Sequence, residues 1–489
     1  MAALVVSGAV TAVAQTGPTT SGVLPQATTA AAATASTFVK RSGRVLQING
    51  STFRFSGSNM YWLALDDNVR DAAGPTYPSR RSIDDAMATA AASGGTVVRA
   101  WAGTVGCARC IEPRLGEFNQ AGFTGLDYAV ASARRNGQRL VLSLVDNWAY
   151  YHGSKTTFTG WRGRPESAFF SDPQVIADYQ AYVTHVLTHV NPWTGLAYRD
   201  DPTIMAWETG NEMWCQTCSG NFWDGSWTRK AADHVKAVAP KQLVVDGHAT
   251  DPNCVTACLH VPSLDIASVD LVDDHFYPLR AARVRTSSAT AAAHGKGYLV
   301  GEYDWVNENG GDALPTFLSA VESNPVNGDL LWALIPHADG GGFANHDDGF
   351  QPVLPGPHAR PGAAVAVARR ARRHDVGPRR SAVLALAPAQ PTLSAATRTG
   401  GGVGLVWSGV AGALAYEVQR SDVASGWTTW TTVAAAVDDH RVIDGPTWTD
   451  VSAAATSTTT LPTYRVRARS LGGVVGQWSA PLLAAPQGS

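Results

Sequence analysis

The sequence predicts a (β/α)8 barrel followed by a smaller all-β unit. Over residues 44–375, eight short apolar runs alternate with longer helix-like segments, whereas the chain beyond residue 388 alternates polar and apolar residues. A length of 489 residues suits one large domain and one small domain. An open doubly wound sheet is the alternative, but no glycine-rich nucleotide fingerprint follows the first apolar run.

The eight apolar runs are rich in consecutive Val, Ile and Leu, which is typical of parallel strands covered on both faces. They are FRFSGSNMYW (53–62), TVVRAWA (96–102), RLVLSLVDNW (139–148), TIMAWETGNE (203–212), QLVVDG (242–247), DLVDDHFYP (270–278), YLVGEYDW (298–305) and DLLWALIPH (329–337). Helices are predicted at 82–95, 125–137 and 173–190, and the first two of these segments contain closing glycines.

Composition narrows the class of protein. The apolar content of 45% and charged content of 16% describe a globular chain, and a net charge of -2 gives no electrostatic case for nucleic acid or an acidic membrane. Tryptophan is over-represented, with 16 residues against 13 Phe and 13 Tyr. Flat indole rings stack on the apolar faces of sugars, so the surplus suits carbohydrate binding as well as core packing.

The N-terminal stretch AALVVSGAVTAVAQ is a short apolar run that ends in small residues. It resembles the apolar segment and cleavage site of a signal peptide and is too short to span a bilayer. We therefore expect a secreted, extracellular protein, with residues 1–38 forming the signal peptide and a Thr/Ala-rich linker.

Six cysteines fall in three close pairs: Cys107 and Cys110, Cys215 and Cys218, and Cys254 and Cys258. Such pairs suit either zinc or short-range disulfides. Export favours disulfides, because oxidising compartments preserve them, and no histidine completes a regular zinc spacing nearby.

Carboxylates stand at the ends of two predicted strands. Glu212 closes the fourth run and Glu302 lies near the end of the seventh, and in a (β/α)8 barrel the active residues gather at the carboxyl ends of strands. Two opposed carboxylates suit glycosidic bond cleavage, in which one is a proton donor and the other a nucleophile roughly 5–5.5 Å away. The alternative is a structural ion-pair network across the barrel mouth.

Other strand ends carry polar groups and indoles that we expect at the same rim. The second, third, sixth and eighth runs end with Arg99 and Trp101, with Asp146 to Trp148, with His275 and Tyr277, and with Trp332 and His337.

These residues resemble glycoside hydrolase family 5, a family of retaining (β/α)8 glycosidases. Asn211-Glu212 matches the family's acid/base motif, and Glu302 matches its nucleophile. More closely, the segment FFSDPQVIADYQAYVTHVLTHVNPWTGLAYRDDPTIMAWETGNE is similar to that of fungal and plant endo-β-1,4-mannanases. Those enzymes also carry a Cys-x-x-Cys disulfide after this glutamate, where Cys215 and Cys218 stand.

The resemblance implies a retaining mannanase with Glu212 as acid/base and Glu302 as nucleophile. Asn211 would bond the sugar's 2-hydroxyl, Arg99 and Tyr277 would orient the nucleophile, and His275 would orient Glu212 or a sugar hydroxyl. Trp332 would form the floor under the cleaved sugar. Further substrate-binding candidates, each as well explained by packing, are Trp62, Trp101 and Trp148. Glu208, deeper in the fourth strand, is interpreted as structural.

Two departures keep other activities open. The mannanases continue Asn-Glu-Pro-Arg, whereas Met213 and Trp214 follow here, so β-1,4-glucanase, exo-β-mannosidase and a non-catalytic carbohydrate-binding barrel are alternatives. The mechanism implies no cofactor and no metal. We expect β-mannan or a related β-1,4-glycan as the partner and a monomer.

The domain boundaries follow from these patterns. The catalytic barrel is predicted over residues 39–375, a linker over 376–388, and a module that resembles fibronectin type III over 389–489. A basic cluster, ARRARRHDVGPRR at 368–380, is interpreted as the charged face of the last helix.

Overall fold

The computed structural model describes residues 37–150, 152–215, 225–251, 254, 258–343, 387–422, 426, 428–439, 445–455, 461–470 and 473–486. Three predicted features fall wholly or almost wholly outside these residues: the signal peptide and linker at 1–38, the basic cluster at 368–380, and most of the linker at 376–388. Those predictions, and the domain boundaries that rest on them, stay predictions.

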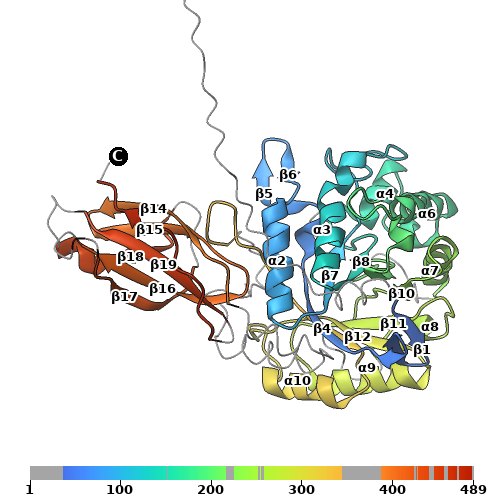
Figure 1. Ribbon diagram of the computed structural model, residues 1–489. Helices are drawn as coiled ribbons and strands as arrows, with labels where there is room; N and C mark the ends of the chain where they lie inside the picture. The colour runs from blue at the N-terminus through green and yellow to red at the C-terminus, as the bar shows by residue number, and fades with distance from the viewer. Residues whose placement is uncertain are drawn as a thin grey trace, which may run out of the picture.

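Eight parallel strands form a closed barrel in the order β10-β11-β12-β13-β4-β7-β8-β9, as the sequence predicts (Figure 1). Each of the eight apolar runs overlaps one of these strands. They are β4 (Phe55–Asn59), β7 (Val97–Trp101), β8 (Arg139–Ser143), β9 (Ile204–Glu208), β10 (Leu243–Val245), β11 (Leu271–Phe276), β12 (Gly297–Tyr303) and β13 (Gly328–Leu331). All their residues are buried, which explains why the runs are continuously apolar and do not alternate.

Helices surround the barrel and cover the outer faces of its strands (Figure 1). They are α2 (Arg80–Ala92), α3 (Thr124–Arg135), α4 (Lys155–Trp161), α5 (Ala168–Ser171), α6 (Pro173–Thr188), α7 (Ser226–Val238), α8 (Val261–Leu264), α9 (Ala281–Ala293) and α10 (Leu314–Ser323). Their starts have local causes. Ser79 caps α2 by accepting from Ser82 N, and Asp172 caps α6 just before Pro173, whose missing N–H costs a first helical turn nothing.

Two small antiparallel sheets were not predicted. One consists of β1 (Lys40–Ser42), β2 (Val45–Ile48) and β3 (Ser51–Thr52), and the other of β5 (Asp66–Asp71) and β6 (Gly74–Thr76). Short 3-10 turns lie at η1 (Tyr61–Leu63), η2 (Gln120–Phe123), η3 (Tyr198–Asp200) and η5 (Val451–Ala455).

The C-terminal unit consists of two antiparallel sheets. β14 (Thr392–Thr399), β15 (Gly402–Ser408) and β18 (Trp448–Asp450) form one; β16 (Ala413–Ser421), β17 (Thr431–Val437), β19 (Thr463–Ser470) and β20 (Leu482–Leu483) form the other. Buried Trp407, Tyr416 and Tyr464 belong to a hydrophobic core of their own. The all-β prediction is therefore confirmed, while the fibronectin type III assignment stays a prediction.

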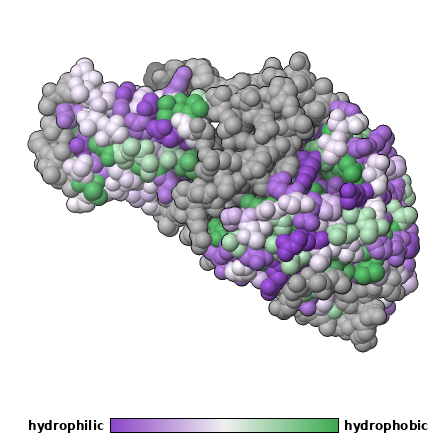
Figure 2. Space-filling view, turned by 90° about the horizontal axis from the view of Figure 1, so that it is seen from below, coloured by the Kyte–Doolittle hydropathy of each residue, from purple (hydrophilic) through white to green (hydrophobic). Residues whose placement is uncertain are grey.

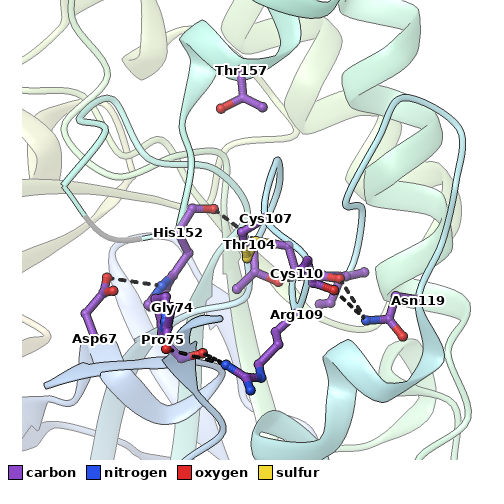
Figure 3. The surroundings of a disulfide bond; sticks show 12 residues. Asp67, Gly74, Pro75, Thr104, Cys107, Arg109, Cys110, Asn119, His152 and Thr157 are labelled. Atoms are coloured by element: carbon purple, nitrogen blue, oxygen red, sulfur yellow. Dashed lines mark hydrogen bonds and ion pairs between the residues drawn. A yellow bond between two sulfur atoms is a disulfide. The ribbon is translucent and has the colours of Figure 1, made fainter. Parts of the chain in front are cut away.

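Two of the three cysteine pairs form disulfides, Cys107 with Cys110 and Cys254 with Cys258. Zinc binding by these two pairs is thereby excluded. Around the first disulfide, the His152 carbonyl faces Cys110 Sγ at 3.8 Å, and His152 Nδ1 lies 3.4 Å from Asp67 (Figure 3). Cys215 is also disulfide-bonded, and its expected partner Cys218 lies outside the described residues.

On the face that Figure 2 shows, polar and apolar side chains are interspersed over the described residues of both units. In the part of the chain that the structure describes, we find no helix of sufficient length and apolarity to cross a bilayer.

Candidate active site

Glu212 and Glu302 face one another at the carboxyl ends of the barrel strands. Glu302 lies in β12, and Glu212 follows β9 with a left-handed backbone, φ 49°, which is uncommon for a side chain of this kind. One carboxylate oxygen of each, together with a ring nitrogen of His275, all lie within 4.8 Å of one another. This spacing fits the two-carboxylate geometry of a retaining glycosidase.

His275 lies between the two carboxylates because the register of β11 and β12 pairs it directly with Glu302. Its Nδ1 is 2.8 Å from Glu212 Oε1 and 3.5 Å from Glu302 Oε2, while Nε2 lies 3.3 Å from Asp273 Oδ2. Gly301 leaves room for this contact, since a Cβ there would lie 2.6 Å from Asp273 Oδ2.

Arg99 connects the nucleophile candidate to the barrel interior. Its Nη1 donates to Glu302 Oε1 at 2.8 Å, and its Nε and Nη2 donate to the two Glu208 oxygens, each at 2.8 Å. Nη2 also donates to Asn211 Oδ1 at 2.7 Å, and Nη1 donates to Asn59 Oδ1 at 3.0 Å. Glu208 is fully buried behind this guanidinium, which agrees with its interpretation as structural.

The remaining contacts orient the two carboxylates. Tyr277 OH donates to Glu302 Oε2 at 3.0 Å, and Trp148 Nε1 donates to Glu212 Oε2 at 2.7 Å. Asn211 Nδ2 donates to Asp146 Oδ1 at 3.0 Å, so this amide is held between a cation and an anion.

Burial and neighbouring charges shift the pKa values of Glu302 and Glu212 in opposite directions. Burial raises the pKa of Glu302 to about 7, although His275 and Arg99 oppose the shift. Burial alone would also raise the pKa of Glu212, but the hydrogen bond and charge of His275, together with the Trp148 hydrogen bond and the charge of Arg99, lower that pKa. The sequence-based expectation was the reverse, a protonated Glu212 beside an ionised Glu302. The reason is that His275, whose own pKa is raised against burial by Glu302, Asp273 and Glu212, pairs most closely with Glu212.

The four tryptophan candidates separate into different environments. Trp332 follows β13 directly and stacks on Tyr61, with ring centroids 5.5 Å apart and planes 23° apart. Trp101 is almost fully buried, donates to Asp146 Oδ2 at 2.9 Å and lies under the Arg99 guanidinium. Trp148 is partly exposed.

Trp62 is not available as a sugar platform. Its side chain is fully buried in the barrel core, and its Nε1 donates to Leu334 O at 3.0 Å. The sequence placed it at a strand end, but β4 stops at Asn59 and Trp62 lies in the inward-packed turn η1. His337 is likewise not at the rim: its ring contacts Asp85 of α2 and Asp439 of the C-terminal unit.

Sequence reasoning missed two residues of the site. Asn59 ends β4 opposite Arg99 and accepts from its guanidinium, a contact that only the strand register reveals. Tyr150 is 73% exposed and stacks on Trp148 with ring centroids 5.8 Å apart. The aromatic cluster WAYY in residues 148–151 was the available signal for it.

Two groups within the described residues have donor atoms close enough to suggest a metal ion, Glu212 with His275 and Glu302, and Asp246 with His248 and His260. In the first, His275 Nδ1 already faces both carboxylates. In the second, the ring centroids of His248 and His260 lie only 3.9 Å apart. Two imidazoles that both direct a nitrogen at one metal ion would lie farther apart than this.

Comparison with known proteins points in one direction. Residues 36–309 match the model of the GH family 5 beta-mannosidase-like proteins. Mannan endo-1,4-beta-mannosidase 1 of Oryza sativa subsp. japonica is 34% identical over 269 residues, which are 49% of this chain and 59% of that protein. Mannan endo-1,4-beta-mannosidase 8 of the same plant is 29% identical over 367 residues, 65% of this chain and 95% of that protein.

Among solved structures, an endo-1,4-beta-D-mannanase from Thermotoga petrophila RKU-1 superimposes with a TM-score of 0.57 at 26% identity, covering 66% of this chain and all of that one. The match to the family model covers the barrel strands from β4 to β12, including Glu212 and Glu302. The chain therefore belongs to glycoside hydrolase family 5, as a mannan endo-1,4-β-mannosidase-like glycoside hydrolase.

Proposed function

We propose that the protein is a secreted enzyme that cleaves β-1,4-mannosidic bonds within mannan-type polysaccharides by a two-glutamate double displacement. The observation that carries this proposal is the opposition of the Glu212 and Glu302 oxygens, within 4.8 Å, across His275 at the barrel mouth. The activities for which the rice and Thermotoga relatives are named support mannan as the substrate.

In the first step, the ionised Glu302 attacks the anomeric carbon while the leaving oxygen takes a proton from Glu212. The proton is held by the Glu212–His275 pair, whose 2.8 Å contact lets it pass between the carboxylate and the ring. In the second step, Glu212 removes a proton from water, the resulting hydroxyl bonds to the anomeric carbon, and the bond to Glu302 breaks. Arg99 and Tyr277 hold the attacking carboxylate in place.

Substrate binding is assigned to the groups that surround this pair. Trp332 provides the floor under the cleaved sugar, supported from behind by the ring of Tyr61. Asn211 binds the 2-hydroxyl, a hydrogen bond that strengthens in the transition state. Trp148 contacts the sugar on the acid/base side, and Trp101 supports the floor from within the core.

The test is product analysis of the purified protein on β-1,4-mannan, with cellulose and mannobiose alongside. Short mannooligosaccharides are the expected products. Glu212→Gln and Glu302→Gln should each reduce kcat by about a thousandfold or more while sugar binding persists. Turnover close to that of the wild type in either variant would refute the assigned pair.

Exo action is the second candidate, because Met213 and Trp214 stand where the endo-mannanases carry proline and arginine. Met213, in the proline position, is fully buried with its N–H bonded to Gly247 O, while Trp214, in the arginine position, leaves the leaving-group side without the family's cation. Mannose as the sole product from mannan would establish exo action, and hydrolysis of cellulose alone would establish a glucanase.

Secretion is supported by the Cys107–Cys110 and Cys254–Cys258 disulfides, since such bonds persist in oxidising compartments. N-terminal sequencing of the exported protein should find residues 1–14 removed or largely removed. Recovery of the whole chain from the cell interior with reduced cysteines would contradict export. Size-exclusion chromatography tests the expected monomer.

A further inference from the structure

A buried histidine joins the barrel to the C-terminal unit. His337, in the segment after β13, has its Nδ1 at 2.8 Å from both oxygens of Asp85 on α2. Its Nε2 lies 2.9 Å from Asp439 Oδ2, which follows β17 of the C-terminal unit. The three side chains are only 1%, 8% and 5% exposed.

The arrangement favours a charged ring. An imidazole can donate from both nitrogens only when it is protonated, and here each nitrogen faces a carboxylate. Burial alone would lower the pKa of His337, but the charges of Asp85 and Asp439 raise it to about 10. The ring therefore stays cationic throughout the neutral range, and a buried ion pair of this kind is costly to break from one side.

The backbone of the two units also approaches closely at this point. A Cβ on Gly409 would lie 2.1 Å from His337 Cδ2, so only glycine admits the ring. Arg81 Nη1 donates to Ala338 O at 2.9 Å and its Nη2 donates to Gly409 O at 3.3 Å, while Gly412 N donates to Thr89 Oγ1 at 3.1 Å. In Figure 1 the C-terminal strands lie on the side of the barrel where α2 runs.

The same segment carries the proposed sugar floor. Trp332 is five residues before His337, and between them Leu334 N donates to Asn59 O at 2.9 Å while Leu334 O accepts from Trp62. Asn59 in turn accepts from Arg99, which binds Glu302. The segment 332–337 is thus held at its start by the catalytic centre and at its end by the C-terminal unit.

We propose that the C-terminal unit contributes to the active site. Asp439 of this unit acts through His337 to position the 332–337 segment and its Trp332. Asp439 and His337 are positioning residues: neither touches the substrate. The inference rests on the proposed function for the role of Trp332 but not for the junction itself.

The test is a double-mutant cycle on the full-length protein. His337→Gln and Asp439→Asn should each lower kcat/KM on mannohexaose about tenfold, through a misplaced floor. The double variant should lose no more than the worse single variant, because both changes break the same contact. Asp438→Asn is the matched control: this neighbouring aspartate is exposed, and its variant should keep the wild-type kcat and KM.

A structural role alone would give a different result. It would lower the unfolding temperature of the variants while their kcat and KM at 25 °C stayed at wild-type values, and that outcome overturns the inference. Losses that multiply in the double variant would also overturn it. Should His337→Gln fail to fold, the comparison of kcat and KM between Asp439→Asn and Asp438→Asn tests the inference by itself.

Near-ultraviolet circular dichroism separates this inference from the proposed function, because it reports aromatic packing without turnover. We expect Asp439→Asn, but not Asp438→Asn, to change the aromatic bands to which the stacked Tyr61 and Trp332 contribute. Wild-type protein that cleaves no β-1,4-glycan refutes the proposed function, whereas unchanged bands together with unchanged kinetics refute the inference alone.

Discussion

The ion pairs at the barrel mouth are almost fully buried, whereas an ion pair in the C-terminal unit is partly exposed. At the mouth, Arg99 is 1% exposed and binds Glu208 and Glu302, which are 0% and 6% exposed. In the C-terminal unit, Arg467 and Glu417 pair across β16 and β19 at 2.6 Å, but the arginine is 26% exposed and stacks on Trp478. Fully buried charges hold one another in a fixed geometry, whereas pairs that solvent reaches contribute less to stability.

The largest expected effect comes from removing the buried cation. Arg99→Met leaves two buried carboxylates without their partner and should reduce the free energy of unfolding by about 3–5 kcal/mol. Arg467→Met, the matched change in the C-terminal unit, should cost about 1 kcal/mol or less. Denaturant titration of both variants measures the contrast, and equal losses would contradict it.

The pH dependence of the Arg99→Met deficit sharpens this comparison. Burial raises the pKa of Glu208 to about 7 and Arg99 opposes the shift, so removing Arg99 raises that pKa further. Protonation then relieves the unpaired charge, and the deficit should shrink as the pH falls from 8 toward 5. A deficit that grows with acidity would be inconsistent with a buried carboxylate as its cause.

The next effect concerns His275, which lowers the pKa of both Glu212 and Glu302. His275→Asn removes the positive charge, so the pKa of Glu302 should rise and the acidic limb of the kcat/KM profile should move to higher pH. The basic limb should move to lower pH, because the ring that retains the shared proton, with a pKa raised well above its usual value, is gone. The maximum rate should fall about a hundredfold, since the proton donor loses its partner. A lower rate with both limbs unmoved would show that the ring orients the site without tuning it.

The smallest effect lies at the exposed edge of the site. Tyr150→Ala should raise KM for mannooligosaccharides about threefold to tenfold and leave kcat unchanged, because an exposed ring stacked on Trp148 contributes ~0.5–1.5 kcal/mol of stacking. Trp193→Ala is the control: this residue is 48% exposed but lies over Arg80 and Tyr128 on the outer helices. A matching rise in KM for both variants would exclude a specific subsite.

Sequence reasoning reached the barrel and its pair of glutamates because both depend on local pattern. Continuous apolar runs identify buried parallel strands, and the strand ends of one barrel gather at one rim, so Glu212, Glu302, Arg99, His275 and Tyr277 were predicted to meet and do meet. The assigned roles of these residues stay predictions until the variants are measured.

What sequence reasoning missed depends on contacts between distant segments. The Trp62 side chain turns inward because β4 ends three residues earlier, and a strand end cannot be located that closely from propensity. Nothing local couples Asp85, His337 and Asp439, which are separated by more than 350 residues from first to last, so the eight-strand pattern placed His337 at the rim. The direction of the pKa shift in Glu212 likewise follows from a 2.8 Å contact and not from residue identity.

The glycine at 409 has a consequence for protein engineering. A side chain at position 409 would overlap the His337 ring. The C-terminal unit therefore cannot simply be replaced by any other β-domain. In a chimaera, the replacement domain would need a glycine against the His337 ring and a carboxylate side chain beside its Nε2. Sequence searches for related barrels could therefore look for Gly409, Asp439 and His337 together. Their co-occurrence would indicate that the two domains were inherited as one unit and not recently recombined.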